Sequence, residues 1–163
     1  MKLYFTPGAC SLAPHIVLRE GNFRFELETV DLKSKRTESG KNFLDINPKG
    51  YVPALELDDG TVLTETQVIV QYIADLDPAS GLAPAAGSLE RYRLQEWLSF
   101  ISAELHKTLA QLFNPELPPA AQDIVRSTIA RKFSYVDAHL ADNDYLIDDR
   151  FTVADSYACA IVN

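Results

Sequence analysis

The sequence has little cysteine, no long hydrophobic run and no excess of basic residues. Its 163 residues include two cysteines, Cys10 and Cys159, at opposite ends of the chain. This spacing matches neither a disulfide framework nor a set of zinc ligands, so we expect a reducing compartment and no bound metal. No apolar run approaches the roughly 18 residues that a transmembrane helix requires, and Pro7 comes too early for a signal peptide. We therefore expect a cytoplasmic protein with no membrane partner.

The balance of charge disfavours nucleic acid as a partner. The chain has 15 Lys and Arg against 23 Asp and Glu, which gives a formal net charge of −8. Binding to phosphate backbones requires a basic surface, although an acidic protein can still hold a local cationic pocket. The hydrophobic fraction of 47% and the charged fraction of 23% are typical of globular proteins. The chain is long enough to form a core without disulfides.

The first part of the chain, residues 1–77, has the pattern of a mixed α/β domain. Short apolar or alternating runs predict strands, longer amphipathic runs predict helices, and Asp58-Asp59-Gly60 is a hairpin turn signal. We expect strands at 3–5, 25–30, 52–57 and 61–63, and helices at 11–20 and 66–75. A polar stretch follows at 33–41, and the chain between the strands at 25–30 and 52–57 leaves room for one more helix. The order β-α-β-(α)-β-β-α is typical of a thioredoxin-like fold.

The remainder of the chain is predicted to be helical. Residues 78–88 are rich in proline and glycine and predict a linker, and residues 89–163 predict an all-α domain. An apolar stripe indicates a long helix over 94–112, and a second helix is expected over 120–140. A third begins at Thr152, where the carboxylate of Asp155 completes a capping box. Its apolar end lacks a stop signal, so we expect a truncated chain without its final helices.

Cys10 follows the Pro7-Gly8 turn signal at the expected start of the first helix. Free backbone N–H groups and the helix dipole stabilise an anion there, which lowers the pKa of a thiol. This position predicts a reactive thiolate. The alternative is a small buried side chain with an inert S–H group, the commoner state of a free cysteine.

Two other segments have the features of a binding site. Val52-Pro53 opens a strand, where a cis bond would leave the backbone of Val52 free to pair with an extended peptide. Glu65-Thr66 starts a helix, where N–H groups and the Thr66 hydroxyl suit a ligand carboxylate and Glu65 suits a ligand ammonium. The alternatives are a strand-edge proline without a ligand and ordinary capping of the helix.

His106 lies off the apolar stripe of the long helix. Helical spacing places it on one face with the small residues Ser99 and Ala103. Beside a thiolate, its imidazole could stabilise the anion or transfer a proton. A solvated surface histidine is the alternative, and His15 and His139 are expected to be structural.

Several segments together resemble the bacterial beta-class glutathione S-transferases, and the match extends in order along the whole chain. These segments are 1–11, 47–55, 63–66, 104–107 and 149–155. The resemblance implies a thioredoxin-like glutathione-binding domain followed by a helical domain. It also implies a detoxifying cytosolic homodimer that conjugates glutathione, as co-substrate and without a resident cofactor, to small hydrophobic electrophiles.

The same resemblance implies roles for individual residues. Cys10 faces the sulfur of glutathione and His106 approaches it from the helical domain. Lys35 binds the glycine carboxylate, Val52 pairs with the cysteinyl backbone, and Glu65 and Thr66 hold the γ-glutamyl end. The remaining wall is formed by Ser99, Ala103, Glu104 and His106, and this helix face also contributes to the site of the neighbouring subunit. Asp148 stands where the family commonly has glycine, so it would be strained if that position requires a positive φ.

Two other functions remain open. Glutathione-dependent thiol–disulfide exchange would use a monothiol route, because Cys10-Ser11-Leu12-Ala13 lacks a second cysteine. A non-catalytic binding protein on the same fold is the other, since fold does not imply function.

Overall fold

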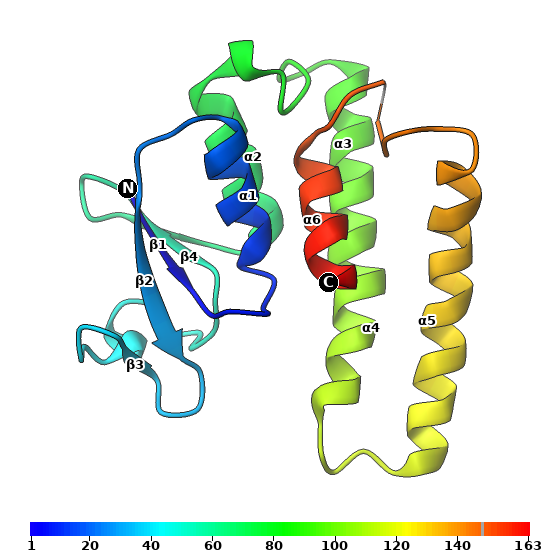
Figure 1. The fold of residues 1–163 in the computed structure, drawn as a ribbon, viewed down its shortest axis with the longest axis horizontal. Coiled ribbons are helices and arrows are strands. Elements are labelled where there is room, and N and C mark those ends of the chain that lie inside the picture. Colours follow the sequence, from blue (N-terminus) through cyan, green and yellow to red (C-terminus); the bar gives the residue numbers. More distant parts are fainter. Residues whose placement is uncertain (148) are drawn as a thin grey trace.

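The computed structural model describes residues 1–147 and 149–163. The expectation about the backbone of Asp148 lies outside the described residues. Figure 1 shows a sheet on one side, helices beside it, and a group of longer helices on the other side. The elements of the sheet part are β1 Lys2–Phe5, α1 Leu12–Glu20, β2 Glu26–Asp31, β3 Arg36–Thr37, β4 Ala54–Glu56, β5 Val62–Thr64 and α2 Thr66–Leu76.

The sheet has the strand order β3-β2-β1-β4-β5. The central strand β1 pairs in parallel with β2, where Leu3 is opposite Leu27, and antiparallel with β4, where Leu3 is opposite Leu55. β4 and β5 form the expected hairpin. Leu3 and Tyr4 are 0% and 1% exposed, because α1 and α2 cover one face of the sheet and a smaller cluster around Phe43 covers the other. Because both faces of β1 are buried, its sequence after the first residue is a continuous apolar run and does not alternate between apolar and polar residues.

The polar stretch differs from the prediction. It contains the short strand β3, which pairs antiparallel with β2 so that Thr37 is opposite Val30. The helix allowed for after this stretch is a single 3-10 turn, Phe43–Asp45. A strand of two residues has no detectable alternation, and its pairing with β2 is a long-range contact that local sequence patterns do not reveal.

The helical part begins with one nearly continuous helical segment. It comprises α3 Leu89–Phe100, a π-helical turn Ile101–His106, α4 Lys107–Ala110 and a 3-10 turn Gln111–Phe113. The predicted apolar stripe is confirmed over its first part, because Leu94, Leu98, Ile101 and Leu105 are at most 1% exposed. α5 Pro119–Leu140 and α6 Val153–Val162 follow. None of the helices in the described ranges is long and apolar enough to span a membrane.

The last helix, α6, joins the two parts of the molecule. Figure 1 shows it between α3 and the helices beside the sheet. The predicted capping box at Thr152 and Asp155 is present. The Ser156 hydroxyl donates to the Ala13 carbonyl of α1 at 2.8 Å, and Tyr157 belongs to the core cluster that contains residues of both parts. The thioredoxin-like and helical architecture is thus confirmed, and the boundaries 1–77, 78–88 and 89–163 stay a prediction.

Candidate functional site

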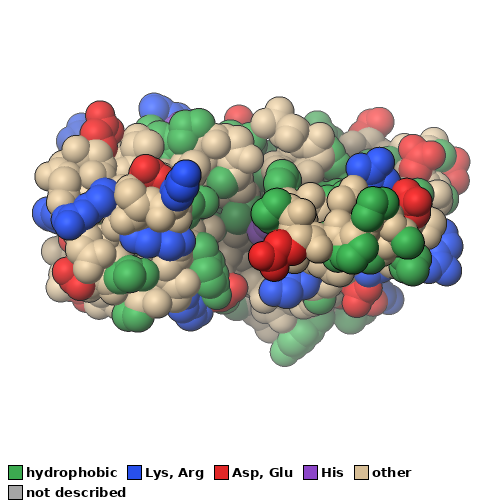
Figure 2. Space-filling view, turned by 90° about the horizontal axis from the view of Figure 1, so that it is seen from below, with side chains coloured by type: hydrophobic (Ala, Val, Ile, Leu, Met, Phe, Trp, Pro, Cys, Tyr) green, Lys and Arg blue, Asp and Glu red, His purple; other side chains and the backbone are tan. Residues whose placement is uncertain are grey.

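A cavity of about 300 Å³ lies between the sheet part and the helical part. Figure 2 shows the surface hollowed between the two parts of the molecule. This volume is at the lower end of the range for small-molecule sites. The sheet part contributes Cys10, Tyr51, Val52, Pro53, Glu65 and Thr66, and the helical part contributes Ser102, His106, Lys107, Ala110 and Tyr157.

Cys10 lies one residue before Ser11, the N-cap of α1, and its thiol donates to the Val52 carbonyl at 3.5 Å. Burial raises the pKa of this thiol, and the negative charge of Glu65 adds to the rise. The Thr66 hydroxyl and nearby backbone N–H groups oppose the rise but are outweighed by burial. The predicted low-pKa thiolate is therefore wrong for this structure. Cys10 is a protonated thiol that faces the cavity.

The Val52-Pro53 peptide bond is cis, as the sequence suggested. The Val52 side chain is buried against Phe43 and Tyr4 on the far face of the sheet, while its carbonyl faces Cys10. The loop therefore places a backbone group of Val52 at the cavity. Pairing of this residue with a ligand stays a prediction.

Glu65 and Thr66 lie at the start of α2, also at the cavity wall. The Glu65 side chain does not cap the helix but accepts a hydrogen bond from Lys49 Nζ at 2.6 Å. Its φ of 70° is in the left-handed region, where a non-glycine residue costs about 1 kcal/mol or more and where ligand sites are enriched. Thr66 is 5% exposed, and its hydroxyl favours a lower pKa of the Cys10 thiol. The capping alternative is thus not observed for the Glu65 carboxylate.

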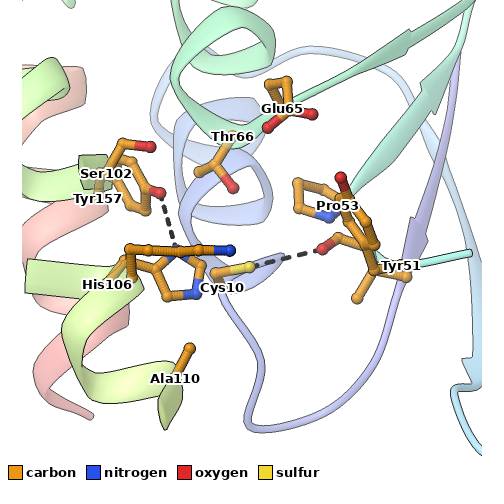
Figure 3. Close-up of a pocket in the computed structure, with 11 residues that line it drawn as sticks. Cys10, Tyr51, Pro53, Glu65, Thr66, Ser102, His106, Ala110 and Tyr157 are labelled. Carbon is orange, nitrogen blue, oxygen red and sulfur yellow. Dashed lines mark hydrogen bonds between the residues drawn. The ribbon is translucent and has the colours of Figure 1, made fainter. Parts of the chain in front are cut away.

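His106 and Tyr157 form a pair on the helical side of the cavity. The Nδ1 atom of His106 lies 2.9 Å from the Tyr157 hydroxyl, and Figure 3 shows the imidazole below this hydroxyl, on the same side of the view as Tyr157 and next to Cys10. Burial, with a contribution from the Lys107 charge, lowers the pKa of His106, so the imidazole is neutral at neutral pH. The alternative of a solvated surface histidine is therefore not observed.

The wall formed by the long helix differs from the expectation. Ser99, Ala103 and Glu104 are exposed and lie outside the cavity lining, and Ser102, Lys107 and Ala110 occupy it with His106. The cause is the π-helical turn, in which the Lys107 N–H donates to the Ser102 carbonyl five residues back. One extra residue in a turn rotates the preceding helix by about 100°, so a spacing of seven no longer brings Ser99 beside His106.

Glu104 turns toward α5 instead of the cavity. Its carboxylate pairs with Lys132 at 2.7 Å, and the same ammonium donates to the Glu104 carbonyl and to the Thr108 hydroxyl. A role of Ser99, Ala103 or Glu104 in another subunit's site stays a prediction.

Lys35 also lies outside the cavity lining. Its Nζ donates to the Gly50 carbonyl at 2.6 Å, in the loop that leads to Val52. The structure thus brings together five of the predicted residues, Cys10, Val52, Glu65, Thr66 and His106. Lys35 instead lies outside the cavity lining and is hydrogen-bonded to Gly50. In the described ranges, no group of three or more His, Cys, Asp and Glu side chains could hold a metal ion.

The sequence did not identify the lining residues Tyr51, Ser102, Lys107, Ala110 and Tyr157, and Tyr157 is the most buried of them. It is 2% exposed and comes from a helix about 50 residues beyond His106 along the chain. No local pattern distinguishes it from other apolar positions of α6. Ser102 and Ala110 carry a weak signal, because both are four residues from His106 and share its helix face.

The raised pKa of Cys10 predicts slow alkylation. At neutral pH, iodoacetamide is expected to label exposed Cys159 well before Cys10, and Cys10 labelling should accelerate as the pH rises above about 8.5. The measurement is mass spectrometry of peptides from timed reactions, with Cys159→Ser as the control that isolates Cys10. Faster labelling of Cys10 than of Cys159 at neutral pH would contradict the burial argument.

The chain thus has a thioredoxin-like part followed by a helical part, and the thiol of Cys10 faces a cavity between them. The family model for the glutathione S-transferase N-terminal domain matches residues 8–76, and the model for the C-terminal domain matches residues 100–163. The chain therefore belongs to the glutathione S-transferase family.

Individual relatives agree with this assignment. Glutathione S-transferase GstA of Escherichia coli O157:H7 is 46% identical over 162 residues, which cover 99% of this chain and 81% of the relative. A sphingomonad glutathione S-transferase complexed with glutathione is 48% identical, with a TM-score of 0.96 and coverage of 99% and 81%. A bacterial beta-class glutathione S-transferase of Sphingomonas chungbukensis is 44% identical, with the same TM-score of 0.96 and the same coverage of 99% and 81%.

Proposed function

We propose that this chain transfers the thiol of glutathione to small hydrophobic electrophiles, with glutathione as a co-substrate and without a resident cofactor. The observation that carries the proposal is the convergence of Cys10, the Val52 backbone, the start of α2 and His106 on one cavity. We extend the proposal to a cytoplasmic homodimer with a role in detoxification. The two free cysteines suit a reducing compartment, and the family assignment supports the remainder.

In this proposal, glutathione lies extended along the sheet side of the cavity. Its γ-glutamyl end binds at Glu65 and Thr66, and its cysteinyl backbone pairs with Val52 as an added strand. Its glycine carboxylate points toward Lys35, which would have to exchange its bond to Gly50 for a bond to the ligand. Its sulfur lies between Cys10 and His106. The electrophile occupies the helical side, near Tyr157, Lys107 and Ala110.

The transfer step needs an anionic sulfur. The glutathione thiol loses its proton to solvent, its sulfur forms a bond to the electrophilic carbon, and the leaving group departs with the electron pair of its bond. The cavity assists by holding both reactants together and by donating hydrogen bonds to the anion. We assign this role to the neutral imidazole of His106 and to the protonated thiol of Cys10, which would exchange its bond to the Val52 carbonyl for one to the ligand (Figure 3).

Cys10 is better suited to this supporting role than to thiol–disulfide exchange. Exchange requires attack by a thiolate, and burial raises the pKa of Cys10. The segment 10–13 also contains no second thiol that could resolve a mixed disulfide. These observations favour conjugation over a reductase activity.

The proposal is tested by titrating the protein with glutathione in a calorimeter and by measuring conjugation to chlorodinitrobenzene. We expect saturable binding and turnover well above the reaction in buffer. Cys10→Ala should retain measurable conjugation, and Cys159→Ala serves as the matched control with unchanged rates. Binding without conjugation to any of a panel of electrophiles would instead indicate a binding protein, and failure to bind glutathione would refute the proposal.

A further inference from the structure

Tyr157 is a buried polar side chain at the centre of the site. Its hydroxyl lies 2.9 Å from Nδ1 of His106, and the two rings meet edge to face at 86°. The side chain is 2% exposed and lines the cavity from α6, on the helical side. A buried tyrosine usually finds one partner for its hydroxyl. The partner here is the imidazole that faces the reacting sulfur in the proposed function.

The surroundings of the hydroxyl indicate which atom carries the shared proton. Burial raises the pKa of Tyr157 to about 12, so the phenol keeps its proton at neutral pH. Of the two partners, a phenol O–H is the stronger donor, and the unprotonated nitrogen of a neutral imidazole is the stronger acceptor. The phenol therefore donates its proton to the ring. The acceptor within reach is Nδ1 of His106.

A neutral imidazole carries one proton on its two nitrogens, so a hydrogen bond to one nitrogen determines the state of the other. If Nδ1 accepts, the proton is on Nε2. Figure 3 shows the second ring nitrogen on the edge of the imidazole opposite the Tyr157 hydroxyl, and His106 lines the cavity, so this nitrogen is the one open to a ligand. The other titratable or charged groups at the cavity are Cys10, Tyr51, Glu65 and Lys107.

We propose that Tyr157 is a positioning residue: its hydroxyl donates to Nδ1 of His106, holds the imidazole in the Nε2–H tautomer and thereby presents an N–H donor to the sulfur of glutathione. The last clause rests on the proposed function, and the tautomer does not. In this arrangement, α6 supplies the hydroxyl that bonds to the imidazole nitrogen on the side away from the sulfur. The same helix is docked on α1 by Ser156, which links the position of the tyrosine to the thiol-bearing part.

The first experiment reads the tautomer directly. Long-range proton–nitrogen correlation spectra of isotope-labelled protein distinguish the two neutral tautomers, and the His106→Phe spectrum assigns the signal among the three histidines. We expect the Nε2–H pattern in the wild-type protein without any ligand. In Tyr157→Phe, which keeps the ring and loses only the hydroxyl, a mixture of tautomers should appear. Tyr135→Phe, at an exposed tyrosine on α5, is the matched control and should leave the signal unchanged.

The second experiment measures conjugation kinetics. Tyr157→Phe is expected to lower kcat by about tenfold, with little change in the KM for glutathione. A loss of about tenfold corresponds to the net contribution of about one hydrogen bond. If Tyr157 acts through His106, the same substitution in a His106→Phe background should have no further effect on kcat. Additive losses would show that Tyr157 acts independently of His106, through packing or through contact with the electrophile, and would overturn the proposal.

The two readouts separate this inference from the proposed function. An Nδ1–H tautomer in the wild-type spectrum, or an unchanged spectrum in Tyr157→Phe, refutes the positioning role whatever the activity is. This holds even if a variant folds poorly, because the wild-type spectrum alone can give that result. A protein with the expected tautomer but no conjugation would keep the tyrosine–histidine arrangement and refute the transferase activity.

Discussion

Substitution of His106 by phenylalanine is expected to lower kcat for conjugation by about 100-fold, with a small change in the KM for glutathione. Phenylalanine preserves the ring volume in the cavity but removes both nitrogens, so the anionic sulfur loses one preorganised donor. Removal of one such donor typically costs 100-fold or more when it acts on the charge of the reacting state. The measurement is steady-state kinetics with chlorodinitrobenzene under saturating glutathione.

The pH dependence provides a second signature of the same substitution. A donor to the sulfur lowers the pKa of the bound glutathione thiol below the usual value of about 8.5 for a thiol. Without His106, this pKa should rise, so the variant should recover part of its activity as the pH increases above about 8.5. His15→Phe, at a histidine outside the cavity lining, is the matched control. A rate loss that is equal at all pH values would contradict the role of His106 as a donor to the thiolate.

Substitution of Asp155 by alanine is expected to reduce the free energy of unfolding by about 3 kcal/mol. One carboxylate oxygen accepts from the Leu146 N–H at 2.8 Å, and the other accepts from the Thr152 N–H and the Thr152 hydroxyl at 2.8 and 2.9 Å. Thr152 is fully buried and Leu146 is 3% exposed, so water cannot readily replace the lost acceptor. The capping box of α6 is lost in the same substitution.

Urea unfolding followed by circular dichroism measures this effect, with Asp142→Ala at an exposed position as the control. We expect a lower urea midpoint for Asp155→Ala and an unchanged midpoint for Asp142→Ala. Because α6 carries Tyr157 into the cavity, the folded fraction of the variant should also show a weaker preference of His106 for one tautomer. An unchanged midpoint would mean that the cap contributes little to the docking of α6.

Much of the fold follows from local patterns along the chain. The helices at 12–20, 66–76 and 119–140 and the hairpin of β4 and β5 were predicted within a few residues, because turn signals and periodicity are local properties. The strand β3 was missed because two polar residues are held only by pairing with β2. The candidate site was predicted best where it coincides with a local signal, as at Cys10, Val52-Pro53 and Glu65-Thr66.

The helical wall of the site was predicted least well. An α-helical spacing placed Ser99 and Ala103 beside His106, whereas the π-helical turn rotates them away. A π turn inserts one residue into a helix without a distinctive sequence pattern, so its effect on the helix face cannot be derived from spacing alone.

The sequence alone was sufficient to assign the family, to place a cysteine before the first helix and to locate the proline loop and the start of α2. These features depend on residues that are close together in the chain. The protonation of Cys10, the neutrality of His106 and the contact of His106 with Tyr157 were decided only by tertiary structure. Each of them depends on burial and on atoms that come from distant segments, because the desolvation of a titratable group is set by everything that packs around it.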